Sequence, residues 1–226
     1  MKHKLYSELC GKSGKILGLL AGAALTLVSG SAHANLITNG SFEDGASVGG
    51  SFSTLTAGST ALMGWTIDWG QIDHIGTYWT PSQGSRSLDL NGLVPGSISQ
   101  SFTTTSGTPY EVKFDLGGNP DFAGTKTLLV WGDGASVFNQ VFTFDSTGKS
   151  TSNMGWVTES LTFTGGAGST TLHFTSLTFL PVTAPGPAYG PALDNVSVTA
   201  VPLPPSLRLL GGSLVGLVAI SRRKSR

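Results

Sequence analysis

Hydrophobic and polar residues alternate with a period of two through most of the middle of the chain. In the run EVKFDL, Val112, Phe114 and Leu116 fall on one face, and charged residues occupy the other. The run SLDLN repeats the pattern, with Leu88 and Leu90 on one face. Such alternation is typical of strands that bury one face and leave the other in water.

Six further segments have the composition of strands. Thr, Ser, Val and Phe are frequent in them, and Gly, Asn and Asp lie between them. No apolar repeat of helical period runs through this region, and no internal repeat is evident. At least eight short antiparallel strands predict an all-β antiparallel sandwich, with a jelly roll as the favoured topology. The six segments are 98–102, 126–131, 137–144, 157–163, 170–174 and 193–199.

The first 34 residues have the layout of a secretory signal peptide. Several lysines precede an apolar run over residues 16–28, and the sequence SGSAHA follows it. Small residues at Ala32 and Ala34 fit cleavage after Ala34 by signal peptidase, with Asn35 as the first residue of the mature chain. An apolar run of about 13 residues is too short to span a bilayer comfortably. We therefore expect a signal helix within residues 1–34 that is removed during export.

Residues 201–226 have the reverse layout. A proline-rich start precedes an apolar helix over 207–220, interrupted by Arg208, and the chain ends in basic residues. A tail helix packed on the body would need a polar face, which this stretch lacks. The layout resembles the PEP-CTERM sorting signal of Gram-negative bacteria, with Leu203 in place of the name-giving Glu. This resemblance implies an exosortase partner and transient inner-membrane anchoring. The residues that carry it are Val201, Pro202, Pro204, Arg222 and Arg223.

Charge is distributed unevenly along a chain whose formal net charge is zero. Residues 35–200 contain 4 basic and 12 acidic side chains, which gives this body a net charge of −8. A body so acidic has no basic patch for nucleic acid, so that class of partner is excluded. The single cysteine, Cys10, precedes the expected cleavage site, and the mature chain therefore has no disulfide and no thiol chemistry.

Five runs in a fixed order carry a family resemblance over nearly the whole body. They are NLITNGSFE from Asn35, GWTIDWGQIDHIGTYW from Gly64, GSRSLDLNG from Gly84, GNPD from Gly118 and GPALDNVSV from Gly190. Together they resemble the choice-of-anchor C family, secreted bacterial domains related to plant cell-wall proteins. The resemblance implies an extracytoplasmic sandwich of the galactose-binding-like fold that binds carbohydrate, with no established catalytic reaction. The chain departs from the family pattern after Asp121, where Phe122 and Ala123 stand in place of Gly.

Aromatic residues crowd into a short stretch, Trp65, Trp69, Tyr78 and Trp79. Exposed Trp and Tyr rings stack on the C–H groups of sugars, whereas buried ones fill a core. We expect Trp65 in the core and a binding role for Tyr78 and Trp79, since strand parity prevents both of these from being buried. The predicted carbohydrate-binding residues are Trp69, Tyr78, Trp79, Asp73, His74 and Arg86, with Gln83 as a further polar neighbour.

Two acids are candidate calcium ligands. Asp194 shares strand parity with Val196 and Val198, which predicts an inward carboxylate that must be paired, neutralised or metal-bound. Basic partners are scarce in the body, and Ca²⁺ favours carboxylate and carbonyl oxygens. The resemblance to calcium-containing jelly-roll carbohydrate-binding modules points to the same position and to Glu43. The alternative is that Asp194 caps a turn through its own backbone.

Catalysis is the weaker interpretation. Asp68, Asp73 and Glu159 supply carboxyls for a glycosidase pair, but sequence gives no separation between them. His74 is a candidate general base, and His173 alternates outward between Leu172 and Phe174, which predicts a solvated strand residue. Serine is so frequent in this chain that its presence says little about a Ser-His-Asp triad. We therefore expect a protein that is not an enzyme.

The pattern as a whole predicts an exported, envelope-sorted β-sandwich that binds a glycan at the cell surface or in extracellular polysaccharide. A structural or adhesive surface protein with a protein partner is the rival hypothesis, and a glycoside-active enzyme is the third.

Overall fold

The computed structural model describes residues 34–179 and 188–202, which form eleven β-strands and no helix. The predicted all-β fold is confirmed. The strands are β1 (Phe52–Thr56), β2 (Thr66–Trp69), β3 (Gln71–Ile75), β4 (Ser87–Asp89), β5 (Ser97–Thr104), β6 (Pro109–Gly118), β7 (Thr125–Gly134), β8 (Phe138–Asp145), β9 (Val157–Thr164), β10 (Gly168–Ser176) and β11 (Pro191–Ala200).

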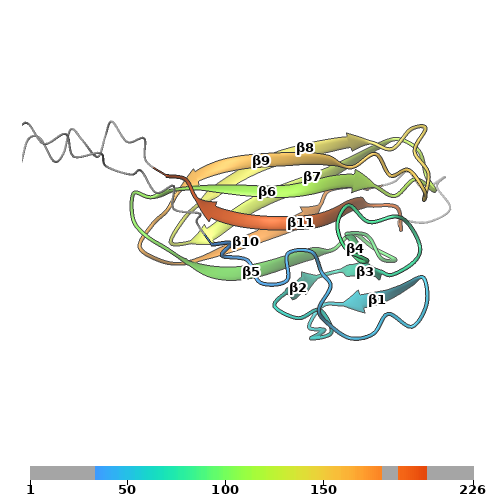
Figure 1. Cartoon of the computed structure of the whole chain (residues 1–226), viewed down its shortest axis with the longest axis horizontal. Helices are drawn as coiled ribbons and strands as arrows, with labels where there is room; N and C mark the ends of the chain where they lie inside the picture. Colours follow the sequence, from blue (N-terminus) through green and yellow to red (C-terminus); the bar gives the residue numbers. More distant parts are fainter. Residues whose placement is uncertain (1–33, 180–187, 203–226) are drawn as a thin grey trace, which may run out of the picture. The chain divides into compact units, whose positions relative to one another are not determined.

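Two antiparallel sheets face each other across one core (Figure 1). The six-stranded sheet has the order β1-β3-β4-β11-β6-β9, and the five-stranded sheet has the order β2-β5-β10-β7-β8. Strands β4 to β11 alone give β4-β11-β6-β9 in one sheet and β5-β10-β7-β8 in the other. This is the winding of a jelly roll, as predicted. Strands β1 and β3 extend the first sheet beyond β4, and β2 extends the second beyond β5.

The inward positions predicted from alternation form the core. Val112, Phe114 and Leu116 of β6 are almost completely buried. The ring of Phe114 packs edge-on against Phe142 and Phe174 of the opposite sheet, with centroids 5.0 and 5.3 Å away. Each such side chain stabilises the fold by about 1.5–3 kcal/mol on burial. Trp65 also belongs to this core, which confirms the packing role expected for it.

A second, smaller cluster covers part of the outer face of the six-stranded sheet. It contains Ile75, Trp79, Met154 and Ala192. Ile75 lies three residues after the core residue Ile72, so it projects to the opposite face of β3. The connections that follow β3 and β8 therefore fold back over this sheet.

The first segment of the domain, at residues 35 and 36, lies beside its last strand, β11 (Figure 1). The backbone N–H of Leu36 donates to the carbonyl of Val198 at 2.9 Å. In return the N–H of Val198 donates to the side-chain oxygen of Asn35 at 2.9 Å. The segment that enters the domain is thus held against its last strand.

Most of the predicted targeting features lie outside the described residues. These are the signal helix, Ala32, the apolar tail helix, Pro204, Arg222 and Arg223. Ala34 and Pro202 are described and exposed, and the N–H of Val201 donates to the carbonyl of Pro109. In the part of the chain that is described, no helix is long and apolar enough to cross a membrane.

Candidate functional site

The outer face of the five-stranded sheet carries a row of polar side chains around one tryptophan. Inward residues such as Leu172 and Phe174 of β10 leave the alternate positions outward. Strand register then places Ser99 of β5, His173 of β10 and Trp131 of β7 next to one another. Ser101, Thr171 and Asp133 form the neighbouring row, and Ser97 and Thr175 lie on the other side.

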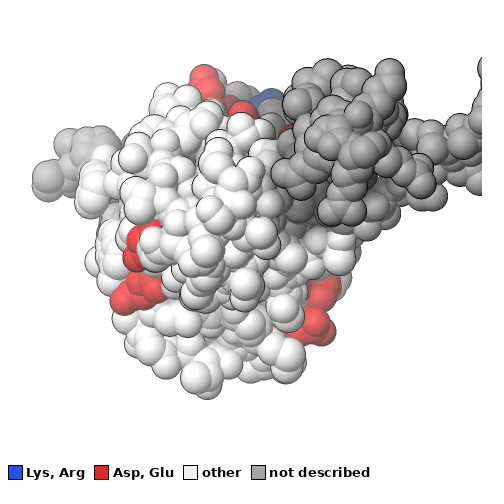
Figure 2. Space-filling model, turned by 90° about the vertical axis from the view of Figure 1, so that its left-hand side faces the viewer, with Lys and Arg blue, Asp and Glu red and all other residues white. Residues whose placement is uncertain are grey.

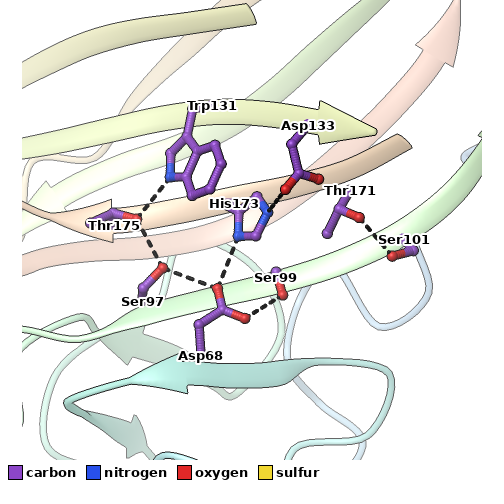
Figure 3. Close-up of polar contacts among 9 residues, drawn as sticks. All are labelled: Asp68, Ser97, Ser99, Ser101, Trp131, Asp133, Thr171, His173 and Thr175. Carbon is purple, nitrogen blue, oxygen red and sulfur yellow. Dashed lines mark hydrogen bonds and ion pairs between the residues drawn. The ribbon is translucent and has the colours of Figure 1, made fainter. Parts of the chain in front are cut away.

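The imidazole of His173 and the indole of Trp131 form the centre of this face (Figure 3). Their rings are stacked, with centroids 3.8 Å apart and planes 6° apart. His173 is buried, and Trp131 is half-buried. The sequence-based expectation of a solvated His173 is therefore wrong, because Trp131 of the neighbouring strand covers the imidazole.

Two carboxylates lie on either side of the imidazole (Figure 3). The Nδ1 atom of His173 is 2.9 Å from an oxygen of Asp68. Its Nε2 atom makes no hydrogen bond, and an oxygen of Asp133 lies 3.6 Å away. Asp68 is thus the closer partner, and it orients the ring.

A register shift in β2 brings Asp68 to this position. Ile67 pairs with Ile98 and Trp69 pairs with Ser97, so Asp68 is an extra residue, as in a β-bulge. Its carboxylate accepts hydrogen bonds from the hydroxyls of Ser99 at 2.6 Å and Ser97 at 3.2 Å. The bulge links the edge strand to the centre of the face.

Hydroxyl groups hold the remaining side chains. The indole N–H of Trp131 donates to Thr175 at 3.1 Å, and the hydroxyls of Thr175 and Ser97 lie 2.8 Å apart. Those of Ser101 and Thr171 lie 3.0 Å apart. The face is therefore an ordered set of donors and acceptors around a fixed ring, which is the composition of a site for a polar ligand.

The geometry lacks a hydroxyl nucleophile activated by this histidine. Ser97 and Ser99 donate to Asp68, and His173 has no serine hydroxyl as a partner among the described residues. The three acids considered for glycoside cleavage do not share a face either. Asp68 belongs to the five-stranded sheet, whereas Asp73 and Glu159 belong to the six-stranded sheet.

Most of the predicted carbohydrate-binding residues lie elsewhere and are covered. Trp79 is 4% exposed, and its N–H donates to Ser87 at 2.8 Å, so it offers no ring to a sugar. Tyr78 is half-buried, with its hydroxyl bonded to Asp121 and its ring against Phe52. The parity argument does not apply to this pair, because β3 ends at Ile75 and both rings lie in the following loop, 5.8 Å apart beside the same cluster.

Two polar members of the predicted set, Asp73 and His74, are also occupied, whereas only the backbone of Arg86 and Gln83 is bonded. Burial raises the pKa of Asp73, against a 2.6 Å hydrogen bond from Thr54. His74 is buried, which lowers its pKa, and its Nε2 lies 2.9 Å from the carbonyl of Phe42. The backbone N–H of Arg86 donates to Glu43 at 2.9 Å. Gln83 is exposed, and its backbone N–H donates to Asp194.

Trp69 is the exception among the predicted residues. It is 44% exposed and pairs with Ser97, so it lies in the same sheet as the Trp131 face. Sequence reasoning missed Trp131 and Asp133. The sequence around them offers only their alternation with Val130 and Gly132, which indicates that Trp131 and Asp133 share the other face of the strand.

The expected calcium ligands hold a loop instead. Glu43 accepts hydrogen bonds from the N–H groups of Ser85 and Arg86 at 2.7 and 2.9 Å. Burial opposes its ionisation, but these bonds and one from the Ser85 hydroxyl outweigh it and keep the pKa of Glu43 low. One oxygen of Asp194 accepts from Ser82 and Gln83 at 2.9 Å each, and the other accepts from Asn195.

These N–H groups occupy oxygens of both carboxyls that a shared cation would need. No group of three or more His, Cys, Asp or Glu residues arranged for a metal is found within the described ranges. Asp194 is buried as expected, but it pairs with Asp115 on the outer face of its sheet. The parity argument was wrong there, because β11 has an irregularity between Asp194 and Ser197 and Asn195 has a φ of 51°.

Elsewhere on the domain, an open depression of about 900 Å³ is lined by residues 45–46 and 58–66. Its lining has no charged side chain, and its one tryptophan, Trp65, is 4% exposed. It therefore lacks the accessible ring and the carboxylates that the Trp131 face combines with its hydroxyls.

Comparison with known proteins gives the family. Residues 35–199 match the family model described as "Protein of unknown function (DUF642)". The chain belongs to the DUF642 family. The narrower resemblance to choice-of-anchor C domains stays a prediction.

One relative of this DUF642 domain is halomucin of Haloquadratum walsbyi (strain DSM 16790 / HBSQ001). It is 32% identical over 187 residues, which cover 81% of this chain and 2% of halomucin. The chain thus spans only a small part of that protein's length.

Solved structures similar to this DUF642 domain include carbohydrate-binding modules. TmCBM61 in complex with β-1,4-galactotriose matches with a TM-score of 0.46 and 12% identity, over 74% of this chain and 99% of that chain. The CBM22-1 xylan-binding domain from Paenibacillus barcinonensis Xyn10C matches with a TM-score of 0.49 and 16% identity, over 76% and 97%.

Proposed function

We propose that this domain is a non-catalytic carbohydrate-binding β-sandwich and that its ligand lies on the outer face of the five-stranded sheet. The observation that carries the proposal is the half-buried ring of Trp131, fixed by Thr175 and His173 within a row of hydroxyls and carboxylates. An aromatic face stacks on sugar C–H groups, and the polar groups around it bind and orient sugar hydroxyls.

The width of this face suits an oligosaccharide. Trp69 in β2 and Trp131 in β7 are three strands apart. At a spacing of about 4.8 Å between strands, that separation is roughly 14 Å. A glycan chain lying across the strands would pass Ser97, Thr175 and His173 between the two tryptophans.

The cellular setting is part of the same proposal. Signal peptidase would remove residues 1–34, and an exosortase would process the tail after transient anchoring in the inner membrane. The domain would then act at the cell envelope or in extracellular polysaccharide. Intact-mass measurement on protein from the native host tests this, since retention of Arg222 and Arg223 would contradict tail processing.

Trp131→Ala tests the binding face. Loss of one stacking ring costs about 1–3 kcal/mol, by analogy with nucleobase platforms. We therefore expect an affinity loss of about tenfold or more for any polysaccharide that the intact protein binds. Trp156→Ala is the matched control, because it removes another half-buried indole, next to the cluster on the other sheet. Thr175→Val is a milder variant that keeps the Trp131 ring but removes the hydroxyl bonded to its indole and to Ser97.

The readouts are a glycan array and affinity electrophoresis in gels that contain host exopolysaccharide, with calorimetry to confirm folding. Equal binding by Trp131→Ala and the intact protein would contradict the site. Unretarded migration of the intact protein in every polysaccharide would contradict glycan binding.

One observation favours a second candidate, a structural or adhesive protein that binds another protein. Exposed apolar side chains gather where β2 ends, β5 begins and β10 ends. Ser176 donates to Gly96 there, which brings the flanking residues together. These side chains are Trp69, Leu93, Val94, Leu177 and Phe179. Charged substitution of Leu93 and Phe179 that abolishes cell adhesion but leaves glycan binding intact would favour this candidate.

A further inference from the structure

The charges on the Trp131 face are all acidic. Its outward positions include Asp68, Asp133 and, at the far end of β8, Asp145. The described part of the chain has four Lys or Arg residues, and none belongs to this face. Arg86 lies in the loop held by Glu43, Lys113 pairs with Glu111 on β6, and Lys126 is buried. Lys149 lies beyond β8, close enough to Asp145 to interact with its charge, but not beside Asp68 or Asp133.

Figure 2 shows one end of the domain, where separate Asp and Glu patches and one small Lys or Arg patch lie on a mostly uncharged surface. Carboxylates without neighbouring cations repel an anionic ligand, and at low ionic strength this repulsion reaches about 10 Å or more.

The two acids beside His173 differ in what they can offer a ligand. Asp68 accepts hydrogen bonds from Ser97, Ser99 and His173, and its side chain is 23% exposed. Asp133 has a side chain that is 53% exposed, and its nearest ionisable neighbour is the imidazole of His173, with Nε2 at 3.6 Å. The carboxylate of Asp68 is therefore used in hydrogen bonds within the protein, whereas that of Asp133 faces solvent.

Asp133 is also close to the stacking ring. It lies two residues after Trp131 on the same face of β7. Two residues of a strand span about 6.7 Å, roughly the length of one sugar unit. A sugar stacked on Trp131, in a chain that lies across the strands, would thus place its own substituents against the Asp133 carboxylate.

We propose that Asp133 makes this face selective for uncharged glycans over those that carry uronate carboxylates. The inference rests on the proposed function and deepens it. The carboxylate accepts hydrogen bonds from sugar hydroxyls, but it repels a carboxylate in the same position. Asp133 is then a specificity-determining residue and Trp131 supplies affinity for either class.

The test compares two polymers that differ only in charge. Purified protein is titrated by calorimetry with galactan, mannan and a β-glucan, and the polymer bound most tightly is then oxidised at its primary hydroxyls to carboxylates. In 20 mM NaCl we expect the neutral form to bind at least tenfold more tightly. Asp133→Asn keeps an oxygen acceptor and should reduce the ratio of the two affinities, neutral over oxidised polymer, about fivefold. Raising NaCl to 300 mM should reduce this ratio about as much in the intact protein.

Glu159→Gln is the matched control, since it removes one negative charge from the other sheet. The ratio of the affinities for the neutral and oxidised polymers should be the same in Glu159→Gln as in the intact protein. An unchanged ratio in Asp133→Asn, or equal binding of the two polymers by the intact protein, would overturn the inference and leave glycan binding standing. If the intact protein binds none of the neutral polymers, both this inference and the proposed glycan binding are overturned.

Discussion

The imidazole of His173 stacks on the indole of Trp131 and covers one of its two faces. The imidazole is in turn fixed by Asp68, at 2.9 Å from Nδ1. Residues from β2, β10 and β7 therefore set the position of one ring. A ring held in this way loses little conformational freedom when a ligand stacks on it.

We expect His173→Ala to weaken glycan binding by about threefold to tenfold without abolishing it, because the ring stays but loses its support. The near-UV circular dichroism of Trp131 should decrease in the same variant. His74→Ala is an unsuitable control because His74 is buried in the other sheet, so Thr103→Ala, at the end of β5, serves instead. Unaltered affinity together with an altered spectrum would show that the stack has only a structural role.

Trp79→Ala should destabilise the fold strongly. Removal of a buried Trp costs about 3–5 kcal/mol, which lowers the melting temperature of a domain of this size by about 10 °C or more. Tyr78→Phe should have a small effect, since only the hydrogen bond to Asp121 is lost. Differential scanning calorimetry distinguishes the two, and similar melting temperatures for both variants would argue against a buried Trp79.

Stability should fall as pH rises from about 4 to about 8. Burial raises the pKa of Asp89 to about 8, against hydrogen bonds from Asn119, Asn91 and Gly190. Burial likewise raises the pKa of Asp194 to about 7. The folded state then binds more protons than the unfolded state in this range, and the free energy of unfolding decreases with pH.

Urea unfolding at pH 5, 6.5 and 8 measures this slope. Asp89→Asn should flatten it, because Asn cannot release a proton. Stability that increases from pH 5 to pH 8 would show that both acids are ionised throughout.

The melting temperature should be the same in millimolar calcium and in EDTA, because Glu43 and Asp194 are bonded to N–H donors. A calcium ion bound at a hundredfold excess over its Kd would instead add about 2.7 kcal/mol of stability. Glu43→Ala should lower the melting temperature in either solution, since the backbone of Ser85 and Arg86 loses its acceptor. A calcium-dependent rise that Glu43→Gln removes would restore the metal site expected from the sequence.

Alternation predicted much of the sandwich. Each of the eight segments identified from alternation or composition contains or overlaps a strand of the jelly roll, from β4 to β11. Strands β1, β2 and β3 were missed because they are short, with five, four and five residues, and because polar residues interrupt them. The parity argument failed at Asp194 because one local irregularity reverses the face of the residues before it.

The candidate site was beyond reach of the sequence for a different reason. Asp68 and His173 are 105 residues apart, and they meet only because β5 pairs with both β2 and β10. Local pattern gives the face of a residue within its strand but gives no information about which strand lies beside it. The aromatic-rich stretch drew attention to Trp79, whose burial depends on loops that follow β3 and β8.

The contact between Asn35 and Val198 has a mechanical consequence. Because the domain is entered and left at one point, a pull on the flanking chain is applied across that contact instead of along the sandwich. Tension would first separate Leu36 from β11 by breaking these hydrogen bonds one at a time. Force would reach the sheets only afterwards. A module attached in this way adds little end-to-end length to the chain in which it stands.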